Sequence, residues 1–234
     1  MCGRFTQKTT PEELARAFDL AAIPDDLGER FNIAPQSPVL VVPGGPGPRR
    51  AVPMQWGLVP QWAKDPSIGA RLANGRSESA HEKPAFRQAL ERRRGLLLMD
   101  GFFEWATEGR IKVPYYFSRP GKEPFAVAAL YERWLPPGEH TEPPLPLWTA
   151  CLLTCEAAAP VAEFHDRMPV VLPRDTWQRW LQAGPLHAND LRELLRPHAD
   201  HFDATRLKRY VNDARHEGPA CLEPEPQAKE VRLI

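Results

Sequence analysis

Proline is the feature that most constrains how this chain can fold. Twenty-seven of its 234 residues are proline, about 12% against an average near 5%. Proline locks φ and lacks a backbone N–H, so the interiors of helices and central strands tolerate it poorly. The prolines occur throughout, with clusters in residues 43–48 and 143–146. This distribution excludes a helical bundle and favours short strands joined by structured loops.

Charge and hydrophobicity set further limits. The chain has 30 Lys and Arg residues against 30 Asp and Glu residues, a formal net charge of zero. No apolar run approaches the roughly 18 residues that a membrane span needs, and the first residues lack the basic-then-apolar order of a secretory signal. We therefore expect a cytoplasmic protein with reduced cysteines and no membrane partner. A nucleic-acid partner would have to be held by a local cluster of positive groups.

The local patterns predict an α+β fold. Thr10-Pro11-Glu12-Glu13 is typical of a capping box and predicts a helix over residues 11–18. Further helices are expected over residues 84–94, with Arg92 to Arg94 as a solvated end, and near 176–182 and 189–195. Strands are expected at residues 3–6, 38–42, 51–59, 96–99, 102–105, 114–118, 125–130, 147–154 and 206–211.

Strands dominate this order, and the helices are interspersed irregularly. We predict a single domain over residues 1–215, with a mainly antiparallel, barrel-like core and short peripheral helices. Residues 216–234 are expected to form a polar, proline-containing tail, with poor order beginning at Asp213.

Cys2 is the most informative single residue. Excision of Met1 would leave a cysteine with a free α-amine and a thiol on adjacent carbons. Such a 1,2-aminothiol condenses with an aldehyde to an imine, and the thiol then closes a thiazolidine ring. Ordinary pKa values near 8 for the amine and 8.5 for the thiol leave usable unprotonated fractions at neutral pH. Taken alone, however, a cysteine at position 2 is more often incidental.

Several short motifs accompany Cys2 in a fixed order. They are Met1-Cys2-Gly3-Arg4-Phe5, Phe31-Asn32-Ile33-Ala34-Pro35, Trp56-Gly57-Leu58-Val59-Pro60 with Trp62-Ala63-Lys64, Asn74-Gly75-Arg76-Ser77-Glu78-Ser79, Gly101-Phe102-Phe103-Glu104-Trp105, Leu153-Thr154, and His165-Asp166-Arg167-Met168-Pro169-Val170. In this order the sequence resembles the SRAP family, named for SOS response-associated peptidase, whose members shield abasic sites in DNA by covalent attachment. The resemblance spans about residues 2–215.

The resemblance implies a substrate and a set of reactive residues. The substrate would be the ring-opened aldehyde of an abasic site in single-stranded DNA, and the product a thiazolidine on Cys2. Asn74 offers a neutral amide that can hold the α-amine or the sugar. Glu104 lies among aromatic residues, where desolvation would raise its pKa toward neutrality and suit it to proton transfer. His165 titrates near neutral pH and would be a second proton-transfer group.

A second set of residues is expected to bind DNA. Arg4, Arg76 and Arg167 each stand two positions after a proposed catalytic residue, so in extended segments each pair would share a face and the three guanidinium groups would converge on phosphates. Stacking platforms or wedges for neighbouring bases are expected from Trp62, Pro35 and Phe31, although Phe31 suits a core position equally well. The hydroxyl of Thr154 would anchor the adjacent backbone or contact DNA.

Two positions depart from the family pattern, and no metal site is expected. Gly75 stands where the family usually has alanine, and Cys155 where threonine or serine is more usual. Cys151 and Cys155 occur in an apolar strand, which fits buried thiols better than zinc ligands. No cofactor is implied.

Other functions remain open at this stage. The N-terminal cysteine would also serve a peptidase or other hydrolase, including one that removes its own Met1. Glu104 and His165 could support an associated strand-cleaving lyase activity or reversal of the cross-link. A start of Met-Cys-Gly also occurs in glutamine amidotransferases, but here Asn74-Gly75 is followed by Arg76 rather than glutamate. A noncovalent reader of modified bases would leave Cys2 unexplained. We expect a monomer that becomes nucleoid-associated when it acts on DNA.

Overall fold

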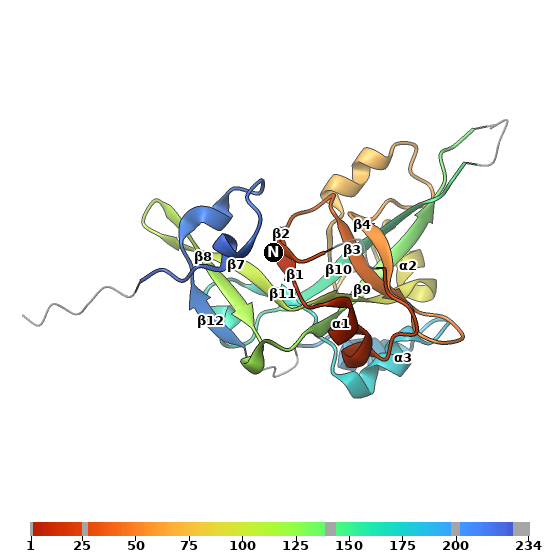
Figure 1. Ribbon diagram of the computed structural model, residues 1–234. Coiled ribbons are helices and arrows are strands. Elements are labelled where there is room, and N and C mark those ends of the chain that lie inside the picture. Colours follow the sequence, from red (N-terminus) through yellow and green to blue (C-terminus); the bar gives the residue numbers. More distant parts are fainter. Residues whose placement is uncertain (1, 25–27, 139–143, 198–201, 227–234) are drawn as a thin grey trace, which may run out of the picture.

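Two sheets make up the framework of the protein. The computed structural model describes residues 2–24, 28–138, 144–197 and 202–226. One sheet has the strand order β12-β8-β7-β1-β2 and is antiparallel throughout. Its strands are β1 (Arg4–Gln7), β2 (Arg30–Ile33), β7 (Gly101–Glu108), β8 (Ile111–Ser118) and β12 (Asp203–Arg206). In Figure 1, β1 begins between this sheet and the second one.

The second sheet closes into a barrel. Its order is β11-β10-β4-β3-β6-β9, and β9 also pairs with β10. The ring therefore consists of β3 (Pro38–Pro43), β4 (Val52–Trp56), β6 (Arg94–Met99), β9 (Phe125–Trp134) and β10 (Leu147–Glu156). Only the β4–β10 pair of this ring is parallel. The predicted α+β class with a barrel-like, mainly antiparallel core is thus confirmed.

The end of β10 extends beyond the ring and carries two short strands. β5 (Asn74–Arg76) pairs with it in parallel, and β11 (Arg167–Pro169) pairs with it antiparallel. Three segments far apart in the sequence therefore meet along one strand. This arrangement brings the Asn74 motif and the His165 motif to the same edge of the barrel.

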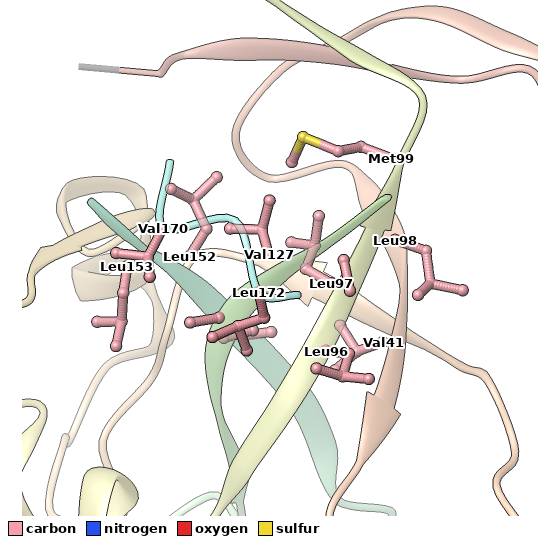
Figure 2. Packing of buried hydrophobic residues seen from close by; sticks show 14 of the residues in the cluster. Val41, Leu96, Leu97, Leu98, Met99, Val127, Leu152, Leu153, Val170 and Leu172 are labelled. Atoms are coloured by element: carbon pink, nitrogen blue, oxygen red, sulfur yellow. The ribbon is translucent and has the colours of Figure 1, made fainter. Parts of the chain in front are cut away.

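Aliphatic side chains fill the barrel. Figure 2 shows residues of β6, β9 and β10 gathered around the segment that follows β11. That segment runs along β9, because the Ala128 amide donates to the Val170 carbonyl at 2.8 Å and the Leu172 amide to the Ala126 carbonyl at 2.9 Å. Burial of this apolar surface supplies the main driving force for the fold. The predicted buried thiols, Cys151 and Cys155, belong to the same core.

Helices are short and peripheral, as expected. They are α1 (Pro11–Phe18), α2 (Arg87–Arg92), α3 (Trp177–Leu181) and α4 (Ala188–Leu194). The capping box is present: Thr10 Oγ1 accepts from the Glu13 amide at 3.3 Å, and the Glu13 carboxylate accepts from the Thr10 amide at 3.2 Å. Within the described residues, no helix is long and apolar enough to span a membrane.

Asp100 fixes β1 against the junction between the two sheets. It lies between β6 and β7 and is buried. Its carboxylate accepts from the Lys8 amide at 2.6 Å and from the Thr9 amide at 2.9 Å. These charge-assisted bonds hold the C-terminal end of the strand whose other end follows Cys2.

Two local predictions need correction. Arg94 is not a solvated helix end: it is buried, and its guanidinium donates to the carbonyls of Leu90 and Trp180, both at 2.7 Å. The helix itself begins only at Arg87. The last strand, expected at residues 206–211, is β12 at Asp203–Arg206, and Arg209–Asn212 forms a 3-10 turn instead.

The expected poor order from Asp213 onward is also wrong for residues 213–226. This segment continues into a 3-10 turn at Pro219–Leu222 and buries Cys221 against Phe31 and Phe103. Asn32 holds it in place, since its amide donates to the carbonyls of Asp213 at 3.0 Å and His216 at 2.9 Å. The rest of the predicted tail, residues 227–234, lies outside the described residues.

Candidate active site and nucleic-acid interface

Cys2 lies fully buried immediately before β1. Its thiol donates to the Arg4 carbonyl over 3.8 Å. Burial raises the pKa of the thiol well above its ordinary value, and the nearby Glu104 carboxylate raises it further. The thiol therefore stays protonated at neutral pH, which makes it a poor first nucleophile.

Asn74 contacts residue 2 directly. The register of β5 places Asn74 opposite Leu152 of β10, and the side-chain amide donates to the Cys2 carbonyl at 2.8 Å. The side-chain oxygen of Asn74 is buried and accepts no hydrogen bond from the described residues. An unsatisfied buried acceptor is costly, and here it lies on a side chain already bonded to the residue that would carry the α-amine.

Glu104 is a buried carboxyl on β7 with an altered pKa. Glu104 is 2% exposed. Burial raises its pKa to about 7, and the negative charge of Asp166 also raises it. This agrees with the expectation from its aromatic neighbours. At neutral pH a large fraction of Glu104 is protonated, so the group can both give and take a proton.

His165 immediately precedes Asp166 and β11. Its Nδ1 accepts a hydrogen bond from the Arg167 amide at 2.9 Å and lies 2.9 Å from a carboxylate oxygen of Asp166. Burial lowers the pKa of the ring, although Asp166 opposes this. The neutral ring therefore predominates at neutral pH, with its proton on Nε2, and a protonated ring would donate to Asp166 from Nδ1.

A groove of about 630 Å³ reaches Asn74 from the surface. Trp62, 58% exposed, forms part of its wall, and Arg76 is also exposed there. The complete lining is Trp62, Arg71, Leu72, Asn74, Arg76, Ser79, Lys83, Pro84, Ala85 and Phe86. The described lining has three basic side chains and no acidic one. Positive charge beside aromatic rings suits a single-stranded nucleic acid.

The three predicted phosphate-binding arginines have different environments. Arg76 lines the groove and makes no side-chain hydrogen bond within the described part of the chain. Arg4 donates to Asn32 at 2.8 Å and to the Val211 carbonyl at 2.9 Å, and it stacks over Trp105 at 5.5 Å. Arg167 forms an ion pair with Glu78. Convergence of all three on one set of phosphates stays a prediction. Of the three guanidinium groups, that of Arg76 alone has no hydrogen-bond partner among the described residues.

The remaining predicted residues are placed as follows. Thr154 is buried, and its hydroxyl donates to the Gly75 carbonyl at 3.5 Å, which favours the backbone-anchoring alternative over DNA contact. Pro35 is partly exposed in the loop between β2 and β3, outside the groove lining. Phe31 packs in the small core with Phe103, so the core interpretation holds for it.

Sequence reasoning missed part of the groove. Arg71, Lys83 and Phe86 were not singled out, although they line it together with Trp62 and Arg76. Arg71 closes a 3-10 turn and Lys83 begins the approach to α2, so neither belongs to a conspicuous motif. Their only sequence signal is a basic residue on each side of the Asn74 motif.

The site combines a cysteine at position 2, a buried carboxyl group and a basic groove at the edge of a β-barrel. Comparison with family models shows which protein family has this sequence pattern. Residues 1–214 match the family described as SOS response associated peptidase (SRAP). The chain belongs to this family.

Curated relatives agree with this assignment, and a solved structure shares the fold. The abasic site processing protein YoaM of Bacillus subtilis is 32% identical over 229 residues, covering 96% of this chain and 99% of the relative. The abasic site processing protein YedK of Escherichia coli is 27% identical, with 96% and 100% covered. A crystal structure from Bacteroides thetaiotaomicron matches with a TM-score of 0.82 at 20% identity, covering 96% of this chain and all of that one. The structural match supports the fold.

Proposed function

We propose that the protein captures abasic sites in single-stranded DNA by forming a thiazolidine between Cys2 and the ring-opened sugar. The observation that carries the proposal is the hydrogen bond of 2.8 Å from Asn74 to Cys2, which places residue 2 where the basic groove meets a buried carboxyl. Curated relatives named as abasic site processing proteins support the same substrate. Removal of Met1 is required, because the nitrogen of Cys2 is otherwise a peptide nitrogen.

Glu104 opens the sugar ring in the first step. Its protonated carboxyl donates to the ring oxygen, the bond between C1′ and the ring oxygen breaks, and the hydroxyl on C1′ passes its proton to the other oxygen of the carboxyl group, which leaves a C1′ aldehyde. A pKa of about 7 leaves enough of the acid form for this donation and enough of the base form for the later transfers. The neutral His165, with its proton on Nε2, donates a hydrogen bond to a sugar oxygen.

The amine reacts before the thiol. The α-amine of Cys2 attacks C1′, the carbinolamine loses one water, and an imine forms. The thiol sulfur then adds to the imine carbon, and its proton passes to the nitrogen, which closes the five-membered ring. This order follows from the raised thiol pKa, because sulfur attacks an already activated carbon and transfers its proton within the ring that it forms.

The groove supplies noncovalent affinity for the strand. Arg71, Arg76 and Lys83 neutralise phosphates, and Trp62 stacks on a base without regard to sequence. Three local charges suffice for a protein with no net charge, since the covalent bond, rather than the electrostatic footprint, makes the complex long-lived.

Single-stranded DNA with one abasic site provides the test. The unmodified protein should give a band on a denaturing gel that is stable to heat, and intact mass should equal protein without Met1 plus DNA minus one water. Cys2→Ser keeps the amine and should give a stable band only after borohydride reduction of the imine. A heat-stable band of equal yield from Cys2→Ser without reduction would rule out the thiazolidine.

A peptidase is the less favoured function. The buried Cys2 thiol has a raised pKa, the opposite of an activated nucleophile. Turnover of a peptide by the Met1-free protein, lost in Cys2→Ser and unaffected by DNA, would reverse this preference.

A further inference from the structure

Glu78 and Arg167 form a two-pronged ion pair at the edge of the site. Nη1 of Arg167 donates to one carboxylate oxygen of Glu78 at 2.9 Å and Nη2 to the other at 2.8 Å. Nη2 also donates to the Thr154 carbonyl at 2.6 Å. Glu78 follows β5, and Arg167 begins β11, so the pair bridges the two segments that β10 brings together.

Few donors of Arg167 remain for another anion. A guanidinium has five N–H groups. Two donate to Glu78 and one to the Thr154 carbonyl, and Nε is buried without a partner among the described residues. The two N–H groups left, the buried one on Nε and the second one on Nη1, lie on opposite edges of the guanidinium, so a phosphate cannot be bound by two parallel bonds while Glu78 occupies the fork.

The two partners differ in how firmly they are held. The Arg167 side chain is 13% exposed, and its bond to the Thr154 carbonyl holds it independently of the Glu78 carboxylate. The Glu78 side chain is 53% exposed, so its carboxylate is readily hydrated when it leaves Arg167, and an incoming phosphate then neutralises the guanidinium in its place. Exchange of the anion therefore moves Glu78 and leaves Arg167 in place.

We infer that Glu78 occupies the phosphate-binding fork of Arg167 in the DNA-free protein and sets the affinity for DNA by competing with a backbone phosphate. This inference rests on the proposed function, because it requires a DNA strand at the site. Every strand that binds must displace the carboxylate, which weakens binding to all single strands alike. Asp166, the other acid acting on Arg167 from its own segment, makes no bond to the guanidinium and is largely exposed.

The test measures noncovalent binding. A labelled single strand with one tetrahydrofuran residue, an abasic analogue without an aldehyde, is titrated by fluorescence anisotropy. Glu78→Gln should bind about three- to tenfold more tightly than the unmodified protein. For Glu78→Gln, the plot of log affinity against log salt concentration should be steeper by about 0.7. In the unmodified protein the displaced Glu78 carboxylate binds a cation from solution, which cancels the counterion that the phosphate releases, and the variant lacks this carboxylate.

Two controls separate the exchange from a general effect of charge. Glu82→Gln removes a neighbouring acid whose side chain is 70% exposed and faces His81, and it should change affinity less than twofold. Combined with Arg167→Met, the Glu78→Gln change should lose its effect; if that double variant does not fold, Arg167→Gln, which also removes the charge, replaces Arg167→Met.

The outcomes are distinct. Unchanged or weaker binding by Glu78→Gln would overturn the inference and show that Glu78 orients Arg167. If Glu78→Gln tightens DNA binding equally when Arg167 is also replaced, the effect is one of general charge and the inference is overturned. Absence of DNA binding by the unmodified protein would overturn it as well. The thiazolidine proposal is judged separately, by the denaturing gel on aldehyde-bearing DNA.

Discussion

The buried Glu104 carboxyl makes the stability of the protein depend on pH. Its pKa is about 7 in the folded protein, against an ordinary value of 4.5. Between these values the folded state holds a proton that the unfolded state has released, so the free energy of unfolding falls as the pH rises from about 4.5 to 7. Glu104→Gln removes the ionisation and with it this loss.

The size of the effect follows from the pKa. Each tenfold change in proton affinity is worth about 1.4 kcal/mol, so the ionised carboxylate costs the folded state about 3 kcal/mol above pH 7. At pH 5 the carboxyl is mostly ionised in the unfolded chain but still protonated in the folded protein, and the cost is about 1 kcal/mol. The stability of Glu104→Gln relative to the unmodified protein should therefore rise by about 2 to 3 kcal/mol from pH 5 to pH 8.

Urea unfolding followed by tryptophan fluorescence measures this difference. The unmodified protein, Glu104→Gln and the control Glu91→Gln, which changes an exposed acid on α2, are compared at both pH values. The control should show the same pH dependence as the unmodified protein. The reasoning is refuted if Glu104→Gln gains no stability at pH 8 relative to pH 5, since the carboxyl would then ionise as freely in the fold as in the unfolded chain.

Three further substitutions test the groove and the framework. Trp62→Ala should weaken noncovalent binding of a single strand by about 1 to 3 kcal/mol per stacked base, measured by anisotropy, with an unchanged Tm because the ring is exposed. Gly101→Ala should destabilise by about 1 to 3 kcal/mol in urea, because its Cβ would lie 2.1 Å from the Tyr116 hydroxyl. Arg94→Met should cost about 3 kcal/mol or more in the same assay, because the Trp180 and Leu90 carbonyls lose their donor.

Sequence predicted the elements whose causes are local. The capping box at Thr10 and Glu13 needs only residues three apart, and α1 formed with the predicted bounds. Alternating and apolar runs likewise located the strands of the barrel, although β6, β9 and β10 extend further than predicted and β4 ends at Trp56 instead of residue 59. The pKa of Glu104 was also foreseeable, because its aromatic neighbours in the sequence indicated the burial that raises it.

Features that depend on distant partners were not predictable in this way. In the sequence, Arg94 has the pattern of a solvated arginine at the end of a helix, and only α3, which supplies the Trp180 carbonyl from 86 positions away, explains why it is buried. Residues 213–226 are polar and rich in proline, yet Asn32 bonds their carbonyls. Strand alternation predicted that Arg4, Arg76 and Arg167 would face phosphates, but it did not predict the ion pair of Arg167 with Glu78. Alternation gives the face on which a side chain lies and not the acidic residue that a neighbouring segment places beside it.

Reactivity and stability are linked at this site through burial. Enclosure raises the pKa of Glu104 to about 7, which suits it to proton transfer, and the same enclosure keeps the Cys2 thiol protonated. A protein arranged to attack first with sulfur would need the reverse, a thiolate stabilised by nearby positive charge. Burial of this kind leaves an α-amine able to act as a nucleophile, because a desolvated pocket favours the neutral amine over the ammonium form. In the proposed reaction this arrangement favours imine formation before ring closure, and the closed barrel of β3, β4, β6, β9 and β10 supplies the apolar burial that offsets the ionised carboxylate.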